Sequence, residues 1–183
     1  MTSPLLWYIN RGSGIVLLVV FTLTTVLGVL STGRKFSPLW PRFITQGLHR
    51  SLAGIGTVLL IAHAASAVVD EYVDITWWQA LVPLGGTYKP LYLGLGTLAL
   101  DLIGVIVVTS LLRDRMPTRG WRAVHLLSYL AFGVAVVHGV GIGTDASQRW
   151  VVLLTLGCVG AVGLATMARI GVGLRAAATG SRA

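Results

Sequence analysis

Charged residues and cysteine are scarce in this chain of 183 residues. Only 11% of the residues are charged, six are acidic, and Cys158 is the single cysteine. One cysteine can form neither a disulfide within the chain nor a thiolate metal cage. Hydrophobic residues make up 55% of the sequence, and the mean hydropathy is +0.81. This composition is far too apolar for an ordinary soluble domain and predicts a protein that lives in a lipid bilayer.

Prolines are also few, and none of the six interrupts a long apolar segment. Five such segments, each near the ~20 residues that a membrane-crossing helix needs, lie at residues 13–31, 47–69, 90–112, 121–142 and 150–172. We therefore expect an all-α integral membrane protein, with five transmembrane helices in one domain over residues 1–172 and a tail at 173–183 that frays. Residues 13–31 resemble a signal peptide, but their length and the basic cluster after them favour a retained helix.

The net charge of +8 is explained by the distribution of the basic residues over the two sides of a membrane, so we expect no nucleic-acid partner. When the five spans are threaded through a membrane, eleven of the fourteen basic residues fall on one side: Arg34, Lys35, Arg42, Arg50, Arg113, Arg115, Arg119, Arg122, Arg169, Arg175 and Arg182. The other side holds Arg11, Lys89 and Arg149. The positive-inside rule then puts the N-terminus outside and the C-terminal tail in the cytoplasm, as in a multi-pass protein of the plasma or inner membrane.

Tryptophans mark the ends of the expected spans. All six lie at or beyond a span end, as aromatic residues at membrane interfaces do: Trp7, Trp40, Trp77, Trp78, Trp121 and Trp150. Trp77 and Trp78 fall in the longest outer connection, which is amphipathic. They predict a short segment lying on the outer membrane surface.

The four histidines form two pairs, on the second and fourth spans. Fourteen residues separate His49 from His63, and thirteen separate His125 from His138. Both spans follow an inner connection, so they run parallel, from inside to outside. His49 should then face His125 near the inner leaflet, and His63 should face His138 about 20 Å further out. The sequence therefore predicts two stacked sites of two histidines each.

Two imidazoles at each level suit the axial ligation of a flat iron porphyrin better than a zinc site, which takes three or four protein ligands. No C-x-x-C-H motif is present, so the haem would be b-type, held without covalent attachment. Thirteen residues end about 140° short of whole helical turns, so His125 and His138 do not share a face of an ideal helix. Tilt or a local distortion must absorb that difference.

Several glycines flank the histidines on the same two spans and could leave room for a macrocycle, namely Gly47, Gly54, Gly56, Gly133 and Gly139. Glycine is also common in membrane helices for packing alone. Two alternatives for the histidines stay open. They could be transient ligands in a metal transporter, although such proteins typically have broken helices and a midplane site. They could also only hydrogen-bond between helices in a structural subunit without haem.

The stretches "GLHRSLAGIGTVLLIAHAAS" (47–66) and "WRAVHLLSYLAFGVAVVHGVG" (121–141) resemble the ferric reductase-like transmembrane domain. NADPH oxidases, ferric reductases and the haem membrane subunit of the bacterial periplasmic methionine sulfoxide reductase system share this domain. The likeness covers about residues 8–165. "RGSG" (11–14) and "LGLGTLALDLIGVIVVTSLLR" (93–113) are similar to the small stand-alone bacterial members.

This resemblance implies two stacked b haems, one held by His49 with His125 and the other by His63 with His138. Some bacterial relatives bind one haem, or flavin as well, and no flavin motif is present here. The chain also lacks a G-x-G-x-x-G fingerprint and an αβ pattern, so it needs a separate electron donor.

Basic residues near the histidines are candidates to bind the anionic haem propionates. Arg50 and Arg122 lie one and three residues from a histidine at the inner site, and Arg11 lies near the outer site. Snorkelling or orientation in the membrane would explain the same arginines. Asp101, at the centre of the third span, is costly there and is interpreted as a structural hydrogen bond or as a proton or haem-tuning group.

These observations together predict transmembrane electron transfer by a b-type cytochrome with one or two bis-histidine haems. Electrons would come from a separate flavoprotein or quinol donor and pass to an extracytoplasmic acceptor or redox partner protein. The chain would be the electron-transfer component of an oxidoreductase, and no residue is assigned a catalytic role.

Overall fold

Five long helices dominate the computed structural model, which describes residues 4–31, 42–70, 73, 75–83 and 85–180. They are α1 (Pro4–Ser31), α2 (Arg42–Val69), α4 (Pro90–Leu111), α5 (Thr118–Ile142) and α6 (Arg149–Gly180). Two short helices, α3 (Trp77–Leu81) and the 3-10 turn η1 (Arg113–Arg115), lie in connections. No strand occurs among the described residues, so the predicted all-α class is confirmed. All five long helices are long and apolar enough to cross a membrane.

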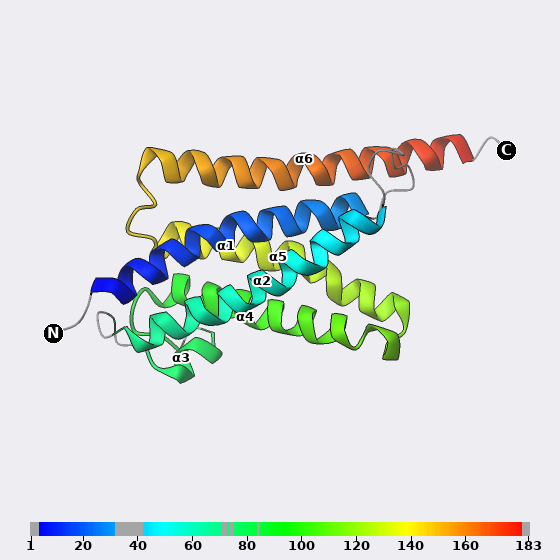
Figure 1. The fold of residues 1–183 in the computed structure, drawn as a ribbon. Helices are drawn as coiled ribbons and strands as arrows, with labels where there is room; N and C mark the ends of the chain where they lie inside the picture. The colour runs from blue at the N-terminus through cyan, green and yellow to red at the C-terminus, as the bar shows by residue number, and fades with distance from the viewer. Residues whose placement is uncertain (1–3, 32–41, 71–72, 74, 84, 181–183) are drawn as a thin grey trace.

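The long helices are arranged as two antiparallel hairpins and an added helix (Figure 1). The most extensive contacts join α1 to α2 and α4 to α5, and α6 packs chiefly along α1. Successive long helices alternate in direction, so α2 and α5 both run toward the end of the bundle where the N-terminus lies (Figure 1). The two histidine-bearing helices are therefore parallel, as the alternation of spans predicts.

The helices reach further than the apolar segments do. α1 begins at Pro4 and α2 at Arg42, nine and five residues before the expected starts at 13 and 47. α6 continues to Gly180, so the tail that the sequence suggested would fray is helical to that residue. Hydropathy marks only the apolar part of a helix, whereas the helix itself continues through good helix formers such as the alanines at 176–178.

A complete capping box starts the short helix α3. The Thr76 hydroxyl accepts from the Gln79 backbone N–H at 3.4 Å, and the Gln79 side chain accepts from the Thr76 backbone N–H at 3.1 Å. The Thr97 hydroxyl of α4 donates to the Gln79 carbonyl at 3.1 Å. The segment predicted around Trp77 and Trp78 is thus a helix fixed against α4.

Large apolar side chains cover the outside of the bundle. Leu111, Leu164 and Val58 have relative exposures of 80%, 74% and 68%, while the buried core is limited to a few mostly small side chains. Helix hydroxyls are satisfied by their own backbone, as where Thr22 donates to the Leu18 carbonyl at 2.7 Å. Such a surface is matched to apolar surroundings.

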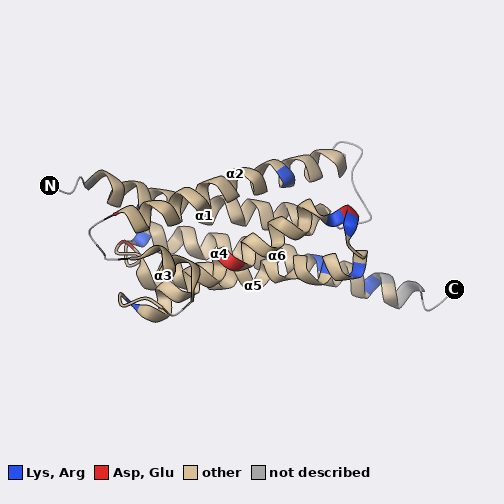
Figure 2. Cartoon of the chain, turned by 90° about the horizontal axis from the view of Figure 1, so that it is seen from below, with Lys and Arg blue, Asp and Glu red and all other residues tan. Residues whose placement is uncertain are grey.

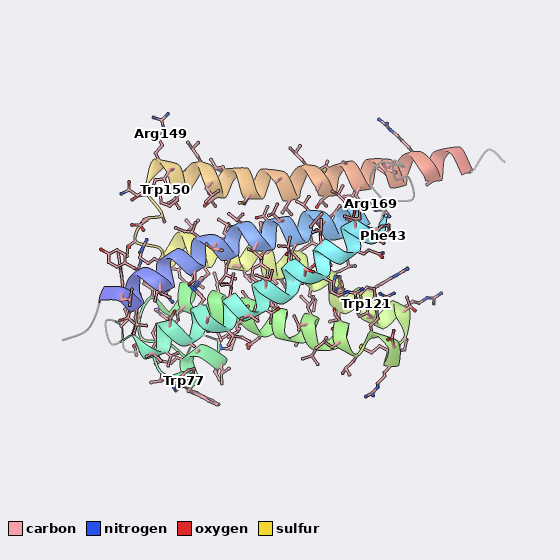
Figure 3. All side chains as sticks on the ribbon, viewed as in Figure 1. Phe43, Trp77, Trp121, Arg149, Trp150 and Arg169 are labelled. Carbon is pink, nitrogen blue, oxygen red and sulfur yellow. The ribbon has the colours of Figure 1, made fainter. Side chains whose placement is uncertain are left out.

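Polar and aromatic side chains gather toward the two ends. Figure 2 shows lysine and arginine concentrated toward the end where the C-terminus lies, with fewer at the opposite end. Figure 3 places Trp77 and Trp150 toward the N-terminal end of the bundle, and Trp121 toward the other. The bundle therefore has an apolar middle between two polar ends.

Candidate functional site

The four histidines come together as the two predicted pairs. At one level, the ring centroids of His49 on α2 and His125 on α5 are 6.1 Å apart, with an angle of 62° between the ring planes. At the other level, His63 and His138 both line a cavity of about 460 Å³ enclosed by the helices. We call His49 and His125 the inner pair, His63 and His138 the outer pair, and this cavity the outer chamber.

Three of the four rings are fixed by a backbone carbonyl of the partner helix in the same hairpin. The Nδ1 atom of His49 lies 2.8 Å from the Thr24 carbonyl of α1, and that of His63 lies 3.1 Å from the Asn10 carbonyl of α1. The Nδ1 atom of His138 lies 2.7 Å from the Tyr92 carbonyl of α4. A carbonyl can only accept, so Nδ1 carries the proton in each ring.

The same bond leaves Nε2 of each neutral ring as an unprotonated nitrogen with a free lone pair. Within the described part of the chain, no hydrogen bond reaches Nε2 of any of the four histidines. A backbone carbonyl on Nδ1 is the usual partner of a histidine whose Nε2 binds a metal, because it fixes the tautomer and the ring direction. In these rings Nε2 is thus the nitrogen that could bind a metal ion.

A glycine lies one turn beyond each of these carbonyls, and the imidazole ring packs against it. A Cβ added at Gly28 would lie 3.2 Å from the His49 ring, and one at Gly14 would lie 3.3 Å from the His63 ring. A Cβ at Gly96 would lie 2.5 Å from the His138 ring. We call the carbonyl, and the glycine four residues after it, a histidine seat.

The seats repeat with the spacing of the histidines. The glycines of α1, Gly14 and Gly28, are fourteen residues apart, as are His63 and His49 on the antiparallel helix α2. Sequence reasoning missed this signal, because it placed the important glycines on the histidine helices. Of those, Gly56 instead packs α2 against Val20 and Phe21, and added Cβ atoms at Gly47, Gly54, Gly133 and Gly139 would meet nothing within 4 Å.

His125 departs from the pattern. Fourteen residues after Gly96, the seat position on α4 is Ser110, whose hydroxyl lies 3.4 Å from the Nδ1 atom of His125. The shorter spacing of thirteen between His125 and His138 occurs in an unbroken helix, and it leaves His125 with a side-chain partner in place of a backbone carbonyl. The angular mismatch expected from the spacing therefore coincides with a different partner at His125, a hydroxyl in place of the carbonyl that the other three histidines have.

An aromatic stack covers His125. The Trp121 ring lies 5.0 Å from the His125 ring at an angle of 29°, and the Arg113 guanidinium lies 4.8 Å from the Trp121 centroid. Among the described residues, Trp121 Nε1 is the one buried side-chain nitrogen or oxygen without a hydrogen-bond partner. Such an orphan donor costs about 1–3 kcal/mol, so its presence beside the inner pair indicates a missing acceptor.

His63 has more hydrogen-bonding groups around it than the other histidines. Besides the Asn10 carbonyl, the Ser13 hydroxyl lies 3.0 Å from its Nδ1 atom. The Asn10 side-chain amide donates to the His63 carbonyl at 2.9 Å and to the Ser66 hydroxyl at 3.1 Å. These contacts fix both the ring and the backbone of His63 against α1.

Arg11 lies at the outer chamber, but it already has an anionic partner. Its side chain forms an ion pair with Asp145, with an Nε to Oδ2 distance of 2.8 Å, and it also donates to the Thr144 hydroxyl. The guanidinium lies 4.8 Å from the Trp7 centroid. Arg11 therefore ties α1 to the connection between α5 and α6 beside the chamber.

Among the described residues, no hydrogen bond or ion pair joins the other predicted arginines to the histidine rings. Arg50 and Arg122 are exposed, and neither makes a hydrogen bond or ion pair with a described residue. Arg113, which sequence reasoning did not single out, is the arginine that reaches the inner pair through Trp121.

The inner pair has the ring separation expected for one metal ion between two imidazoles. Metal–nitrogen bonds of about 2.0–2.1 Å, and roughly 1 Å from each nitrogen to its ring centre, put two such centroids about 6 Å apart. The inner pair, at 6.1 Å, has this separation. Among the described residues, no group of three or more His, Cys, Asp and Glu side chains forms a metal site, so each pair offers two nitrogens only.

A family model described as a domain of unknown function (DUF8596) matches residues 5–145. The match includes both hairpins and all four histidines, whereas α6 lies beyond it. No curated protein and no solved structure matches the chain.

Proposed function

The chain belongs to the DUF8596 family, whose function is unknown, and we propose that it is a membrane-embedded b-type cytochrome that carries electrons between a donor and an extracytoplasmic acceptor. The observation that carries this proposal is the pairing of four carbonyl- or hydroxyl-fixed histidines across two parallel helices. The resemblance to the ferric reductase-like transmembrane domain supports the same function.

The apolar belt and the charge distribution support a location in the plasma or inner membrane. Five helices have the required length and hydropathy, and their outward side chains are largely apolar. The end rich in lysine and arginine would face the cytoplasm by the positive-inside rule (Figure 2). The end with Arg11 and Lys89 would face outward.

The residues present fit haem b. His49 with His125, and His63 with His138, would hold the iron, and the mostly apolar outer chamber would take the body of a macrocycle. Haem bound in this way would supply a one-electron Fe(III)/Fe(II) couple. The histidine seats would keep each Nε2 aimed and basic, as carbonyl partners do at other metal sites.

Anionic propionates also find suitable donors. At the inner pair, the Trp121 N–H has no hydrogen-bond partner among the described residues, and the Arg113 guanidinium lies over the same Trp121 ring. Arg50 and Arg122 are exposed, and they lie one and three residues along the sequence from His49 and His125. At the outer pair, Arg11 would have to share its charge between Asp145 and a propionate. We therefore propose Trp121 and Arg113 as additional cofactor-binding residues.

The absorption spectrum of the detergent-purified protein tests the function. We expect the α band of a low-spin b haem on reduction, and one to two haems per chain by pyridine haemochrome titration. A colourless protein from cells supplied with haem would contradict the proposal, because four prepared imidazoles would then have another use. Haem bound covalently, and so resistant to acid acetone extraction, would contradict the b type.

Replacing Trp121 by phenylalanine tests the missing acceptor. In the haem-free protein, the Trp121→Phe variant should unfold with a free energy within about 1 kcal/mol of the parent, because loss of ring area offsets removal of an orphan donor. In the haem-loaded protein, the inner haem should dissociate about tenfold more readily, since a charge-assisted hydrogen bond of about 1.5 kcal/mol is lost. Trp150→Phe, at the opposite end, is the matched control. Equal haem retention in both variants would refute the role of Trp121.

A further inference from the structure

Asp101 does not belong to the outer chamber but to a second hollow on the side of the bundle. This groove, of about 770 Å³, is bounded by residues of α2, α3 and α4, among them Ile61, Ala65, Trp77 and Gly104. Asp101 occupies the middle of α4, halfway between the two polar ends. The groove therefore opens sideways, at the depth where a membrane-spanning chain meets lipid tails.

The Asp101 carboxyl group is an acceptor in the groove wall with unused hydrogen-bonding capacity. Among the described residues, none forms a hydrogen bond or ion pair with it. The Thr109 hydroxyl, also in the wall, already donates to the Val105 carbonyl at 2.7 Å. The remaining wall is almost entirely hydrocarbon. A carboxyl group in such surroundings is costly without a partner, so a ligand with a hydroxyl donor would be favoured there.

The groove and the outer chamber share part of their walls. Ala64, Ala80 and Leu100 line both the groove and the outer chamber, in which His63 and His138 lie. Two of these three side chains are single methyl groups. A ligand in the groove would therefore lie one side-chain layer from the outer chamber, which the outer pair lines.

We propose that this groove binds the headgroup of a lipid-soluble quinol, with Asp101 as acceptor of a phenolic O–H and the isoprenoid tail in the bilayer. The proposal rests on the proposed function, in which it identifies the membrane donor. A quinol ring is flat and apolar with two hydroxyl groups, which matches a hydrocarbon groove holding one acceptor. Its oxidation to the quinone breaks two O–H bonds. The two electrons would pass one at a time to two ferric haem irons, and the two protons would be taken up in turn by the Asp101 carboxylate and released to solvent.

Direct binding tests the groove without reference to electron transfer. Decylubiquinol carries the two phenolic O–H groups, and its binding can be followed by tryptophan fluorescence, because Trp77 stands in the groove wall. We expect a saturable change in this fluorescence when decylubiquinol is added to the full chain purified in detergent, and a dissociation constant raised about tenfold by Asp101→Asn, since the carboxyl acceptor of the phenolic O–H is replaced by an amide. Asp114→Asn, in the exposed turn η1, is the matched control and should bind as the parent does.

A second variant, Gly104→Leu, fills the groove and keeps the Asp101 carboxyl group. A Cβ at Gly104 would meet nothing within 4 Å, so Gly104→Leu should fold while its side chain fills the groove and abolishes saturable binding. Unchanged binding in both Asp101→Asn and Gly104→Leu would overturn the proposal. Equal sensitivity of cholesterol binding to Asp101→Asn would also overturn it, because the groove would then recognise any lipid hydroxyl.

Reduction by decylubiquinol separates this proposal from the proposed function. With haem-loaded protein, Asp101→Asn should slow reduction by decylubiquinol at least tenfold and leave both haem content and reduction by dithionite unchanged. Haem that is reduced equally fast in parent and variant would overturn the groove and keep the cytochrome. Protein that is purified without haem from cells supplied with haem, but that binds decylubiquinol through Asp101, would overturn the cytochrome and keep the groove.

Discussion

The His63→Ala variant is expected to lose the haem of the outer pair and to keep that of the inner pair. His63 is the most firmly fixed of the four histidines, with the Asn10 carbonyl at 3.1 Å and the Ser13 hydroxyl at 3.0 Å from its Nδ1 atom. Loss of even an outer-shell partner costs 10–100-fold in metal affinity, so loss of the ligand itself should cost more than about 100-fold. Pyridine haemochrome titration should show haem content lower by one equivalent per chain.

The remaining pair provides an internal comparison for this prediction. The His49→Ala variant should lose the inner haem in the same way, so the two variants should differ in the spectrum and reduction potential of the haem that remains. Leu60→Ala is the matched control, because Leu60 lines the outer chamber with hydrocarbon only. Full haem content in His63→Ala, or equal loss in Leu60→Ala, would contradict axial ligation by His63.

A methyl group at Gly96 should disturb the outer pair almost as strongly as loss of a ligand. The Cβ of a Gly96→Ala variant would lie 2.5 Å from two atoms of the His138 ring and 3.0 Å from a third, Nε2. The ring cannot retreat without losing the 2.7 Å bond from its Nδ1 atom to the Tyr92 carbonyl. Overpacking of this kind costs about 1–3 kcal/mol, and it would also turn Nε2 away from its direction in the parent.

We expect Gly96→Ala to lower the unfolding free energy by about 1–3 kcal/mol and to reduce haem content by one equivalent per chain. Denaturant titration in detergent and haemochrome titration measure the two effects. Gly104→Ala, eight residues along the same helix, is the control, since its Cβ would meet nothing within 4 Å. If Gly96→Ala matched this control in both measurements, packing of His138 on Gly96 would have no part in the site.

The histidine seats also indicate how the bundle is built. Each hairpin pairs a helix bearing two histidines with a neighbour bearing two seat positions fourteen residues apart: Gly14 and Gly28 on α1, Gly96 and Ser110 on α4. The two hairpins therefore present their histidines in the same way. The exception at Ser110 leaves His125 the least constrained of the four histidines, with Trp121 stacked on it.

Much of the fold could be predicted from the sequence because it depends on the number and length of apolar segments. Five spans with short connections must alternate in direction, so the second and fourth are parallel whatever their packing. Histidines at like depths on parallel helices must then pair as His49 with His125 and His63 with His138. Helix ends were less predictable, since α1 and α6 continue through residues that are polar or small but still favour helix.

The sequence by itself thus determined the bundle of five helices and the depth of each histidine, because both follow from distance along a helix. Only the tertiary structure decided which side chains meet around the rings: the seats on α1 and α4, the Arg11–Asp145 pair, the Trp121 stack, and the position of Asp101 in a groove of its own. The reason is rotational. These spans are apolar nearly all round, so no pattern in their sequence fixes which face turns inward, and packing between residues 15 to 134 positions apart sets it.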